Sequence, residues 1–285
     1  NQKYLFIAVG LAIVVGFGLY TKALGNKLLF FLVLIMMPLA TTEIGTDGWI
    51  EGIMKGVAKD KFDSGWVLVY TSVIMMVLRF YAGPIVHKLQ PLPLLAISAA
   101  FAIVGLYTLS FTEGMLIFGA ATLYGIGKTF FWPTMLGVVS EQTPKGGALT
   151  LNAISGIGML AVGTLGFPYI GALQAGKQIE AVTENQAIIA QAPSLKDGNF
   201  TTSKTIYEVI KYNTVDEKLL SARLAQDIED ETSRDALQAE IKTTRDNSAQ
   251  GALADMTLFP MIMLGAYLLL IFYFKKKGGY KPVEL

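Results

Sequence analysis

The stretch Leu28–Ile53 reads LLFFLVLIMMPLATTEIGTDGWIEGI and joins an uncharged apolar run to an acidic one. About 20 apolar helical residues are enough to cross the hydrocarbon core of a bilayer. Its second half carries Glu43, Asp47 and Glu51, whose spacing of four residues places all three carboxylates on one helix face. Charges at bilayer depth are costly and usually face a bundle interior or a wet cavity. The stretch therefore predicts a transmembrane helix that contributes to a polar site.

The composition of the whole chain agrees with a membrane environment. Of its 285 residues, 53% are hydrophobic and only 16% are charged, whereas soluble domains typically carry about 25% charged residues. The net charge of +1 and the lack of a basic stripe with interleaved aromatic residues argue against a nucleic-acid partner. The chain has no cysteine, which excludes disulfides and thiolate chemistry.

Seven stretches are long and apolar enough to span a bilayer. They are Tyr4–Tyr20, Leu28–Ile53, Gly65–Val86, Leu92–Phe111, Gly114–Ser140, Ala148–Leu173 and Met256–Phe274. Most are joined by short loops, so consecutive spans are expected to be antiparallel neighbours. The fold class predicted is all-α, a polytopic transmembrane bundle of seven spans. The chain begins at Asn1 without a methionine, from which we expect it to belong to a longer protein.

The distribution of basic residues predicts the orientation in the membrane. Basic side chains follow the first, third, fifth and seventh spans, and the positive-inside rule assigns those loops to the cytoplasm. The C-terminus is then cytoplasmic and the N-terminus is outside. We expect an integral protein of a bacterial inner membrane. The residues that set this orientation are Lys22, Lys27, His87, Lys88, Lys145, Lys275, Lys276, Lys277 and Lys281.

Residues 174–254 form a polar insert between the sixth and seventh spans, on the predicted outer side. Thr214-Val-Asp-Glu217 fits a capping box, and Leu220, Leu224 and Ile228 recur at helical spacing. The pattern predicts a small helical hairpin or cap outside the membrane. Two roles stay open for it: a solvated decoration without chemistry, or a module that gates solute or binds a partner.

Buried charges mark a candidate site near the middle of the membrane. At a rise of about 1.5 Å per residue, Lys128 lies close to the midplane, Glu43 lies roughly 5 Å toward the outer side and Asp47 about 10 Å. Glu43 with Lys128 is the preferred buried pair, and Arg79 is the competing partner. The pair is either a permanent lock between helices or a site whose charges are exchanged against solute or a proton. The residues predicted to bind solute or a coupling ion are Glu43, Asp47, Lys128, Thr42, Tyr124, Trp132, Arg79 and Asn152.

Two motifs resemble those of the major facilitator superfamily. Arg79-Phe-Tyr-Ala-Gly83-Pro-Ile-Val-His87-Lys88 resembles the signature of its cytoplasmic loop between the eighth and ninth helices, with His87 where an Asp is usual. Ser140-Glu141-Gln-Thr-Pro144-Lys145-Gly-Gly-Ala148 resembles the junction between the tenth and eleventh helices, with Gly in place of Arg. Both motifs occur in the family's order and on the predicted cytoplasmic side.

The resemblance implies the C-terminal half of such a transporter. Residues 25–173 and 255–285 would form a six-helix bundle that rocks against an N-terminal partner bundle, and residues 1–24 would be the family's sixth helix. The family's seventh, eighth, tenth and eleventh helices commonly line the cavity, and the corresponding helices here carry most of the buried polar groups. The residues carried over to the gating and cytoplasmic motif are Arg79, Gly83, His87, Lys88, Glu141 and Pro144.

The function predicted is secondary active transport of a small polar solute by alternating access, with a proton as the candidate coupling ion. Sugars, nucleosides and small organic anions all fit the mixture of charge, aromatic rings and hydroxyls. The partners expected are this solute, the lipid bilayer and an N-terminal half, with no cofactor and no metal. No serine, aspartyl or His-metal protease motif is present, so no enzyme activity is expected. The alternative is a receptor or scaffold that does not transport and uses the insert to bind its partner.

Overall fold

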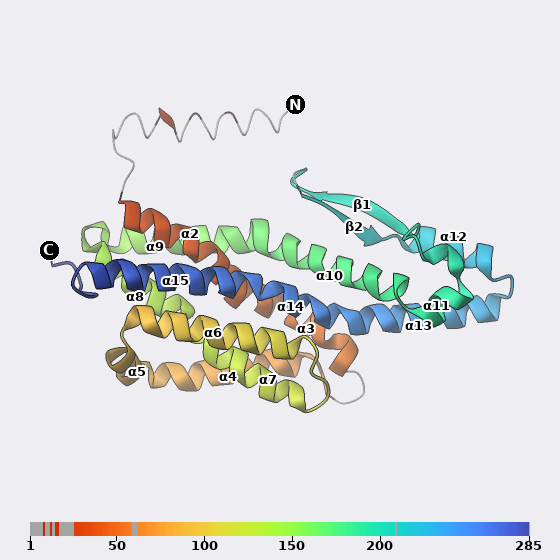
Figure 1. Ribbon diagram of the computed structural model, residues 1–285, viewed down its shortest axis with the longest axis horizontal. Helices are drawn as coiled ribbons and strands as arrows, with labels where there is room; N and C mark the ends of the chain where they lie inside the picture. The colour runs from red at the N-terminus through yellow and green to blue at the C-terminus, as the bar shows by residue number, and fades with distance from the viewer. Residues whose placement is uncertain are drawn as a thin grey trace.

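The computed structural model describes residues 26–58, 62–208 and 210–284, together with residues 8, 12, 15 and 16. The side chain of residue 87 is not described. Apart from those four positions, the predicted span Tyr4–Tyr20 and the predicted segment 1–24 lie outside the described residues. The described chain is mostly helical, with a bundle of long helices at one end and the insert at the other (Figure 1).

The helices of the bundle follow one another through short turns. Two π-helical turns, η1 (Thr41–Gly45) and η3 (Val162–Gly166), join α2 to α3 and α9 to α10. The described bundle contains α2 (Lys27–Ala40), α3 (Thr46–Ala58), α4 (Gly65–Phe80), α5 (Ala82–Leu89), α6 (Pro91–Leu109), α7 (Leu116–Lys128), α8 (Phe131–Gln142), η2 (Pro144–Gly146), α9 (Gly147–Ala161), α14 (Ala252–Met256) and α15 (Leu258–Lys276).

Among the described residues, four helical stretches are long and apolar enough to cross a membrane. They are Lys27–Ala58, Pro91–Leu109, Pro144–Thr183 and Glu231–Lys276, and α4 is a shorter apolar helix. These helices are compatible with a membrane location, but the predicted seven-span arrangement is not confirmed. The predicted span Gly65–Val86 is divided into α4 and α5 at Tyr81, and the predicted span Gly114–Ser140 is divided into α7 and α8.

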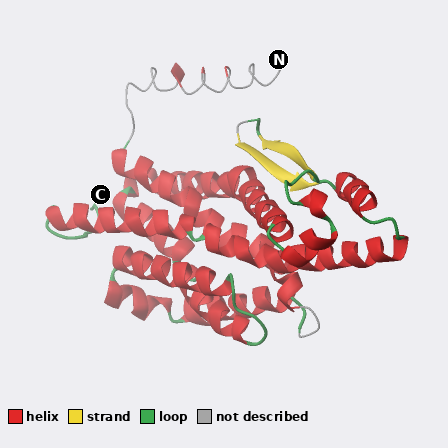
Figure 2. Ribbon diagram, turned by 45° about the vertical axis from the view of Figure 1, so that its right-hand side comes forward, coloured by secondary structure: helices red, strands yellow, loops and turns green. Residues whose placement is uncertain are grey.

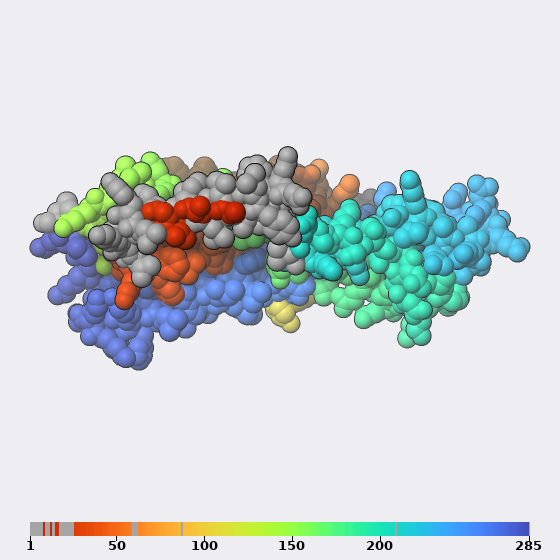
Figure 3. All heavy atoms as spheres, turned by 90° about the horizontal axis from the view of Figure 1, so that it is seen from above, coloured from red at the N-terminus to blue at the C-terminus, as the bar shows by residue number. Residues whose placement is uncertain are grey.

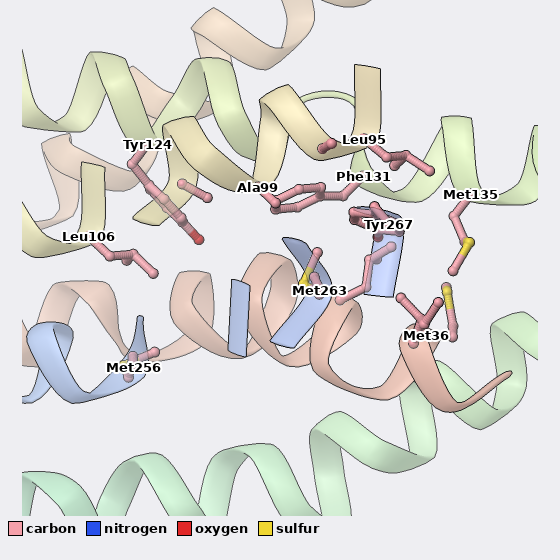
Figure 4. Packing of buried hydrophobic residues seen from close by; sticks show 14 of the residues in the cluster. Met36, Leu95, Ala99, Leu106, Tyr124, Phe131, Met135, Met256, Met263 and Tyr267 are labelled. Atoms are coloured by element: carbon pink, nitrogen blue, oxygen red, sulfur yellow. The ribbon is translucent and has the colours of Figure 1, made fainter. Parts of the chain in front are cut away.

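The tightest packing in the bundle brings the backbones of α6 and α7 together. A Cβ added to Gly105 would lie 2.4 Å from the backbone nitrogen of Tyr124, and one added to Gly127 would lie 2.6 Å from that of Ala102. Small residues allow such close approach between membrane helices. This contact fixes the part of α7 that carries Tyr124 and Lys128. Figure 4 shows Tyr124 in the buried cluster to which α15 contributes Tyr267.

The insert is a folded unit attached to two helices that continue from the bundle. It contains α10 (Phe167–Thr183), α11 (Gln186–Gln191), η4 (Pro193–Leu195), β1 (Thr201–Ile206), β2 (Ile210–Val215), α12 (Glu217–Asp227), α13 (Glu231–Ser248) and η5 (Ala249–Gly251). It forms one end of an elongated molecule (Figure 3). Its own buried cluster comprises Val182, Ile188, Ala192, Leu195, Phe200, Leu220, Leu224, Leu237 and Ile241.

The prediction of a purely helical insert is wrong, because strands β1 and β2 form an antiparallel hairpin (Figure 2). Both strands are rich in Thr and other residues with β propensity and carry little helical periodicity. The predicted capping box is also wrong. Thr214 pairs with Thr202 in the hairpin, and the N-cap of α12 is Asp216, whose side chain accepts hydrogen bonds from the backbone of Lys218 and Leu219.

Direct contacts tie the insert to the bundle. The Gln250 amide donates hydrogen bonds of 2.6 Å to the carbonyl oxygens of Leu109 and Thr112, at the end of α6. Helix α13 lies against α3 so closely that a Cβ on Gly56 would be 2.4 Å from the carbonyl carbon of Asp246. The predicted limits at 174 and 254 fall inside α10 and α14, because the helical stretches Pro144–Thr183 and Glu231–Lys276 continue from the bundle into the insert.

Candidate functional site

The break between α7 and α8 creates the polar groups around which the candidate site forms. Pro133 has no N–H, and its ring is incompatible with an intrahelical bond to the carbonyl four residues earlier, that of Thr129. The chain therefore leaves the helix at Thr129 and Phe130 and restarts at Phe131. A helix N-terminus presents unpaired N–H groups and attracts anions, and a C-terminus attracts cations. The break thus places an anion site at the start of α8 and Lys128 at the end of α7.

Glu43 occupies this anion site. It lies in the π-helical turn η1, where its carboxylate Oε2 accepts a hydrogen bond of 3.2 Å from the backbone N–H of Trp132. Its Oε1 lies 3.0 Å from Nη2 of Arg79. The Nε of Arg79 donates a 3.1 Å bond to the carbonyl oxygen of Thr129, the acceptor that the break sets free. One guanidinium therefore connects α4, η1 and the junction of α7 with α8.

Asp47 and Lys128 form a second ion pair beside the first. The ammonium Nζ of Lys128 contacts Oδ1 of Asp47 and lies 5.1 Å from the ring centroid of Tyr124. The Tyr124 hydroxyl donates a 2.6 Å hydrogen bond to the carbonyl oxygen of Thr42. Tyr124 is almost completely buried, so its ring shields one side of the ammonium from solvent.

The predicted pairing of Glu43 with Lys128 is wrong, and the competing partner Arg79 takes Glu43. The sequence estimate placed residues along straight helices. The helix containing Glu43 has a π-helical turn, and the helix containing Lys128 ends at that residue. Lys128 reaches Asp47 because Asp47 lies one turn after Glu43 on the same face.

The two ion pairs lie beside a cavity of about 520 Å³. One pair exposes its cation to the cavity, and the other exposes its anion. The cavity is lined by Asp47, Ser72, Met75, Met76, Arg79 and Phe80. Its cation, Arg79, is 41% exposed and is held by a carboxylate that is 7% exposed. Its anion, Asp47, is 25% exposed and is held by an ammonium that is fully buried. The cavity therefore presents one charge of each sign, and each has a buried counter-charge behind it.

Two buried hydroxyls lie near this polar region. Thr46 directly precedes Asp47, and its hydroxyl lies beside that of Tyr124. The Tyr267 hydroxyl has no hydrogen-bond partner among the described residues. Buried polar groups are almost always paired, so this hydroxyl has capacity for a water molecule. Tyr267 was missed in the sequence analysis, because it lies in the uniformly apolar sequence of α15, where no pattern distinguishes it.

Other predicted residues lie apart from the ion pairs. Asn152 is exposed on α9. Gly83 and Lys88 are exposed on α5, and the side chain of His87 lies outside the description. Arg79, which also belongs to the predicted cytoplasmic motif, instead donates hydrogen bonds to the Glu43 carboxylate and the Thr129 carbonyl oxygen.

The end of the chain binds the second predicted cytoplasmic motif. The Tyr280 hydroxyl donates a 2.6 Å hydrogen bond to the carboxylate of Glu141, and the backbone N–H of Val283 donates to the Glu141 carbonyl oxygen. The Gln142 amide donates to the carbonyl oxygen of Lys281. Pro144 opens the turn η2 that follows. No hydrophobic periodicity marks this tail, because it follows α15 and is not helical.

The charged groups of the site are paired with one another in two ion pairs. Within the described ranges, no group of three or more His, Cys, Asp or Glu side chains is placed to hold a metal ion. No protein-family model, no curated protein and no solved structure matches the chain. The interpretation of the site therefore depends on its own geometry.

Proposed function

We propose that this protein is a secondary active transporter that moves a small polar solute across the membrane by alternating access. The observation that carries the proposal is that the cavity of about 520 Å³ is lined by one cation and one anion, each with its own buried counter-ion. Arg79 and Asp47 line the cavity, while Glu43 and Lys128 hold them from the buried side. Ionisable groups inside membrane-spanning segments usually mark solute or ion pathways.

The energetics of buried ion pairs make such a site exchangeable. Bringing two charges out of water costs nearly as much as their attraction returns, so a buried pair contributes little net stability. A solute with anionic or hydroxyl groups competes with Glu43 for the donors of Arg79. A solute with donor groups competes with Lys128 for Asp47. The mixture of charge, Ser72 and the Phe80 ring suits sugars, nucleosides and small organic anions.

Proton coupling follows from the same exchange. When solute takes the place of a carboxylate at its cation, the displaced carboxylate is left charged and unpaired at bilayer depth. Such a group neutralises by taking up a proton, because an isolated buried charge is far more costly than a neutral acid. In this scheme Glu43 and Asp47 are the proton acceptors, and solute binding and protonation proceed together.

The proposed architecture is the C-terminal half of a major facilitator transporter, supported by the two cytoplasmic motifs. In that frame, the described bundle rocks against an N-terminal bundle in a bacterial inner membrane, with the insert outside. The cavity lies between α3 and α4, which correspond to parts of the family's seventh and eighth helices, and these commonly line its transport cavity.

Transport by the full-length protein in proteoliposomes tests the proposal. A panel of radiolabelled sugars, nucleosides and organic anions would be screened for uptake driven by an imposed pH gradient. We expect uptake of one class, with losses of at least tenfold in Asp47→Asn and Arg79→Gln. Lys218→Gln, an exposed change in α12, serves as the matched control and should keep full activity. Uptake that both site variants retain would contradict the role of the cavity.

The rival function is a receptor or scaffold that does not transport. The separate hydrophobic core of the insert favours this rival, because a unit that folds around its own buried cluster can present a binding surface. Binding of a labelled solute without counterflow between the two sides of the vesicle would support the rival and contradict the transporter.

A further inference from the structure

An apolar groove of about 360 Å³ opens on the bundle where the insert begins. Its floor comes from α2, and its two sides come from η3 with α10 and from α15. The β-hairpin of the insert closes one end, because Ile206 and Ile210 belong to the lining. In Figure 1 the hairpin extends back from the insert along α10 toward the bundle. The groove is separate from the ion pairs and uses none of their residues.

The walls of this groove are suited to hydrocarbon. They belong to three of the stretches that are long and apolar enough to cross a membrane. Large apolar side chains line it while remaining roughly half exposed: Leu34 is 46%, Leu165 is 44% and Leu258 is 47% exposed. The described residues of the lining include no charged side chain. Exposed apolar patches of this kind mark contact with lipid or a partner.

The hairpin carries an apolar pair next to its turn. Ile206 lies opposite Ile210 in the register and is buried, and the turn beyond them holds Tyr207 and Glu208. Side chains alternate between the two faces of a strand, so the exposed Lys204 lies on the face of Ile206 and Lys211 lies on the other face. A rise of about 3.3 Å per residue places Lys204 roughly 7 Å from Ile206. A cation at this distance suits a segment whose isoleucines contact acyl chains while its lysine stays at the headgroups.

We propose that the groove binds one acyl chain of a phospholipid from the leaflet on the insert's side of the membrane. The hairpin end forms one wall of the site, and Lys204, which lies on the same strand face as Ile206, contacts the lipid phosphate. The lipid is the occupant that this combination favours, because the described lining of the groove is apolar and adjoins the cation of Lys204 at the hairpin end. The proposal is independent of which solute, if any, the ion pairs bind.

Photo-crosslinking tests the acyl site in the full-length protein reconstituted in lipid nanodiscs. The probe is a phosphatidylglycerol with a diazirine on its acyl chain, and labelled peptides are mapped by mass spectrometry. We expect labelling to concentrate on the peptides that contain Leu34 and Leu258. Leu34→Trp with Leu258→Trp fills the groove and should lower that labelling at least fivefold. Leu160→Trp, at a 67% exposed position of α9 outside the lining, should leave it unchanged.

A second comparison separates lipid from free phosphate and from apolar contact alone. Lys204→Glu should lower labelling by the phospholipid probe, but not by a diacylglycerol probe that lacks the phosphate, whereas Lys211→Glu, on the opposite strand face, should leave both unchanged. Inorganic phosphate should not compete with either probe. Competition by phosphate, or labelling spread evenly over the exposed faces of the helices, would overturn the proposal. Gel filtration and tryptophan fluorescence identify any variant that fails to fold, and Ile206→Ser with Ile210→Ser then tests the same wall from the insert.

Discussion

The ammonium of Lys128 contacts Oδ1 of Asp47, and the two side chains differ sharply in exposure, with 0% for Lys128 and 25% for Asp47. The carboxylate is thus the member of the pair that solvent or solute reaches first. Any event that removes the negative charge of Asp47 leaves a cation in the interior of the bundle without its counter-ion. The stability of the bundle and the occupancy of the cavity are therefore linked through this one contact.

Asp47→Asn is expected to lower the free energy of unfolding by about 3 kcal/mol, because breaking a buried pair leaves an uncompensated charge. Thermal unfolding of the purified protein in detergent measures the loss. In the double variant Asp47→Asn with Lys128→Met, the buried charge is gone as well. Most of the stability should return in this variant, while solute binding stays lost. A double variant as unstable as Asp47→Asn alone would show that the pair does not control stability.

Arg79→Lys is expected to weaken solute uptake about tenfold or more, although it keeps the positive charge. A lysine lacks the planar fork with which Arg79 reaches both Glu43 and the carbonyl of Thr129. Loss of one hydrogen bond to a charged group is worth about 1.5–3 kcal/mol. The concentration dependence of uptake in proteoliposomes measures the change, with Lys218→Gln as the control. Unaltered uptake would mean that charge alone is sufficient at this position.

The acidic helix face and its buried cationic partners could be predicted from the sequence, because charge in apolar stretches is rare and costly. The correct pairing could not. It depends on a π-helical turn around Glu43 and on the end of α7 at Lys128. Pro133 stands in the sequence as a helix-breaking residue, but its effect on the Thr129 carbonyl becomes visible only when Arg79 is placed in space.

The insert shows a second limit of reasoning from the sequence. Leu220 and Leu224 were expected to share a helical face, and both are buried in its cluster. The hairpin was missed because its strands alternate weakly and lack an Asn-Gly or Asp-Gly turn. Two non-glycine residues with positive φ, Tyr207 at 51° and Glu208 at 57°, form the turn instead. Packing of the hairpin against α10 stabilises a turn that local preference disfavours.

Gly56→Leu is expected to separate the insert from the bundle. A Cβ at this position would lie 2.4 Å from backbone atoms of Asp246, so either α13 or α3 must move. Overpacking of this kind typically costs about 1–3 kcal/mol. Hydrogen exchange of α13 should increase in the variant. Gly52→Leu, one turn earlier on α3 with nothing within 4 Å of the added Cβ, should leave exchange unchanged. Equal exchange in both variants would argue against a rigid connection.

Tyr280→Phe is expected to destabilise the protein in a pH-dependent manner. Burial raises the pKa of Tyr280, and its hydrogen bond to the Glu141 carboxylate raises the pKa further. A folded-state pKa above the unfolded value of about 10 stabilises the fold fully below pH ~10, and this contribution is lost as pH rises through the folded-state pKa.

The variant should therefore unfold more easily than the wild type at pH 8, by about 1 kcal/mol for one lost hydrogen bond. The difference should shrink as pH rises above about 10, because the tyrosine of the unfolded wild type then ionises while the buried tyrosine keeps its proton, which favours the unfolded state. Unfolding in detergent across this pH range measures both parts. Tyr107→Phe, at a 58% exposed position of α6, should match the wild type throughout. A difference between wild type and Tyr280→Phe that is constant with pH would assign the effect to packing instead of the Tyr280–Glu141 hydrogen bond.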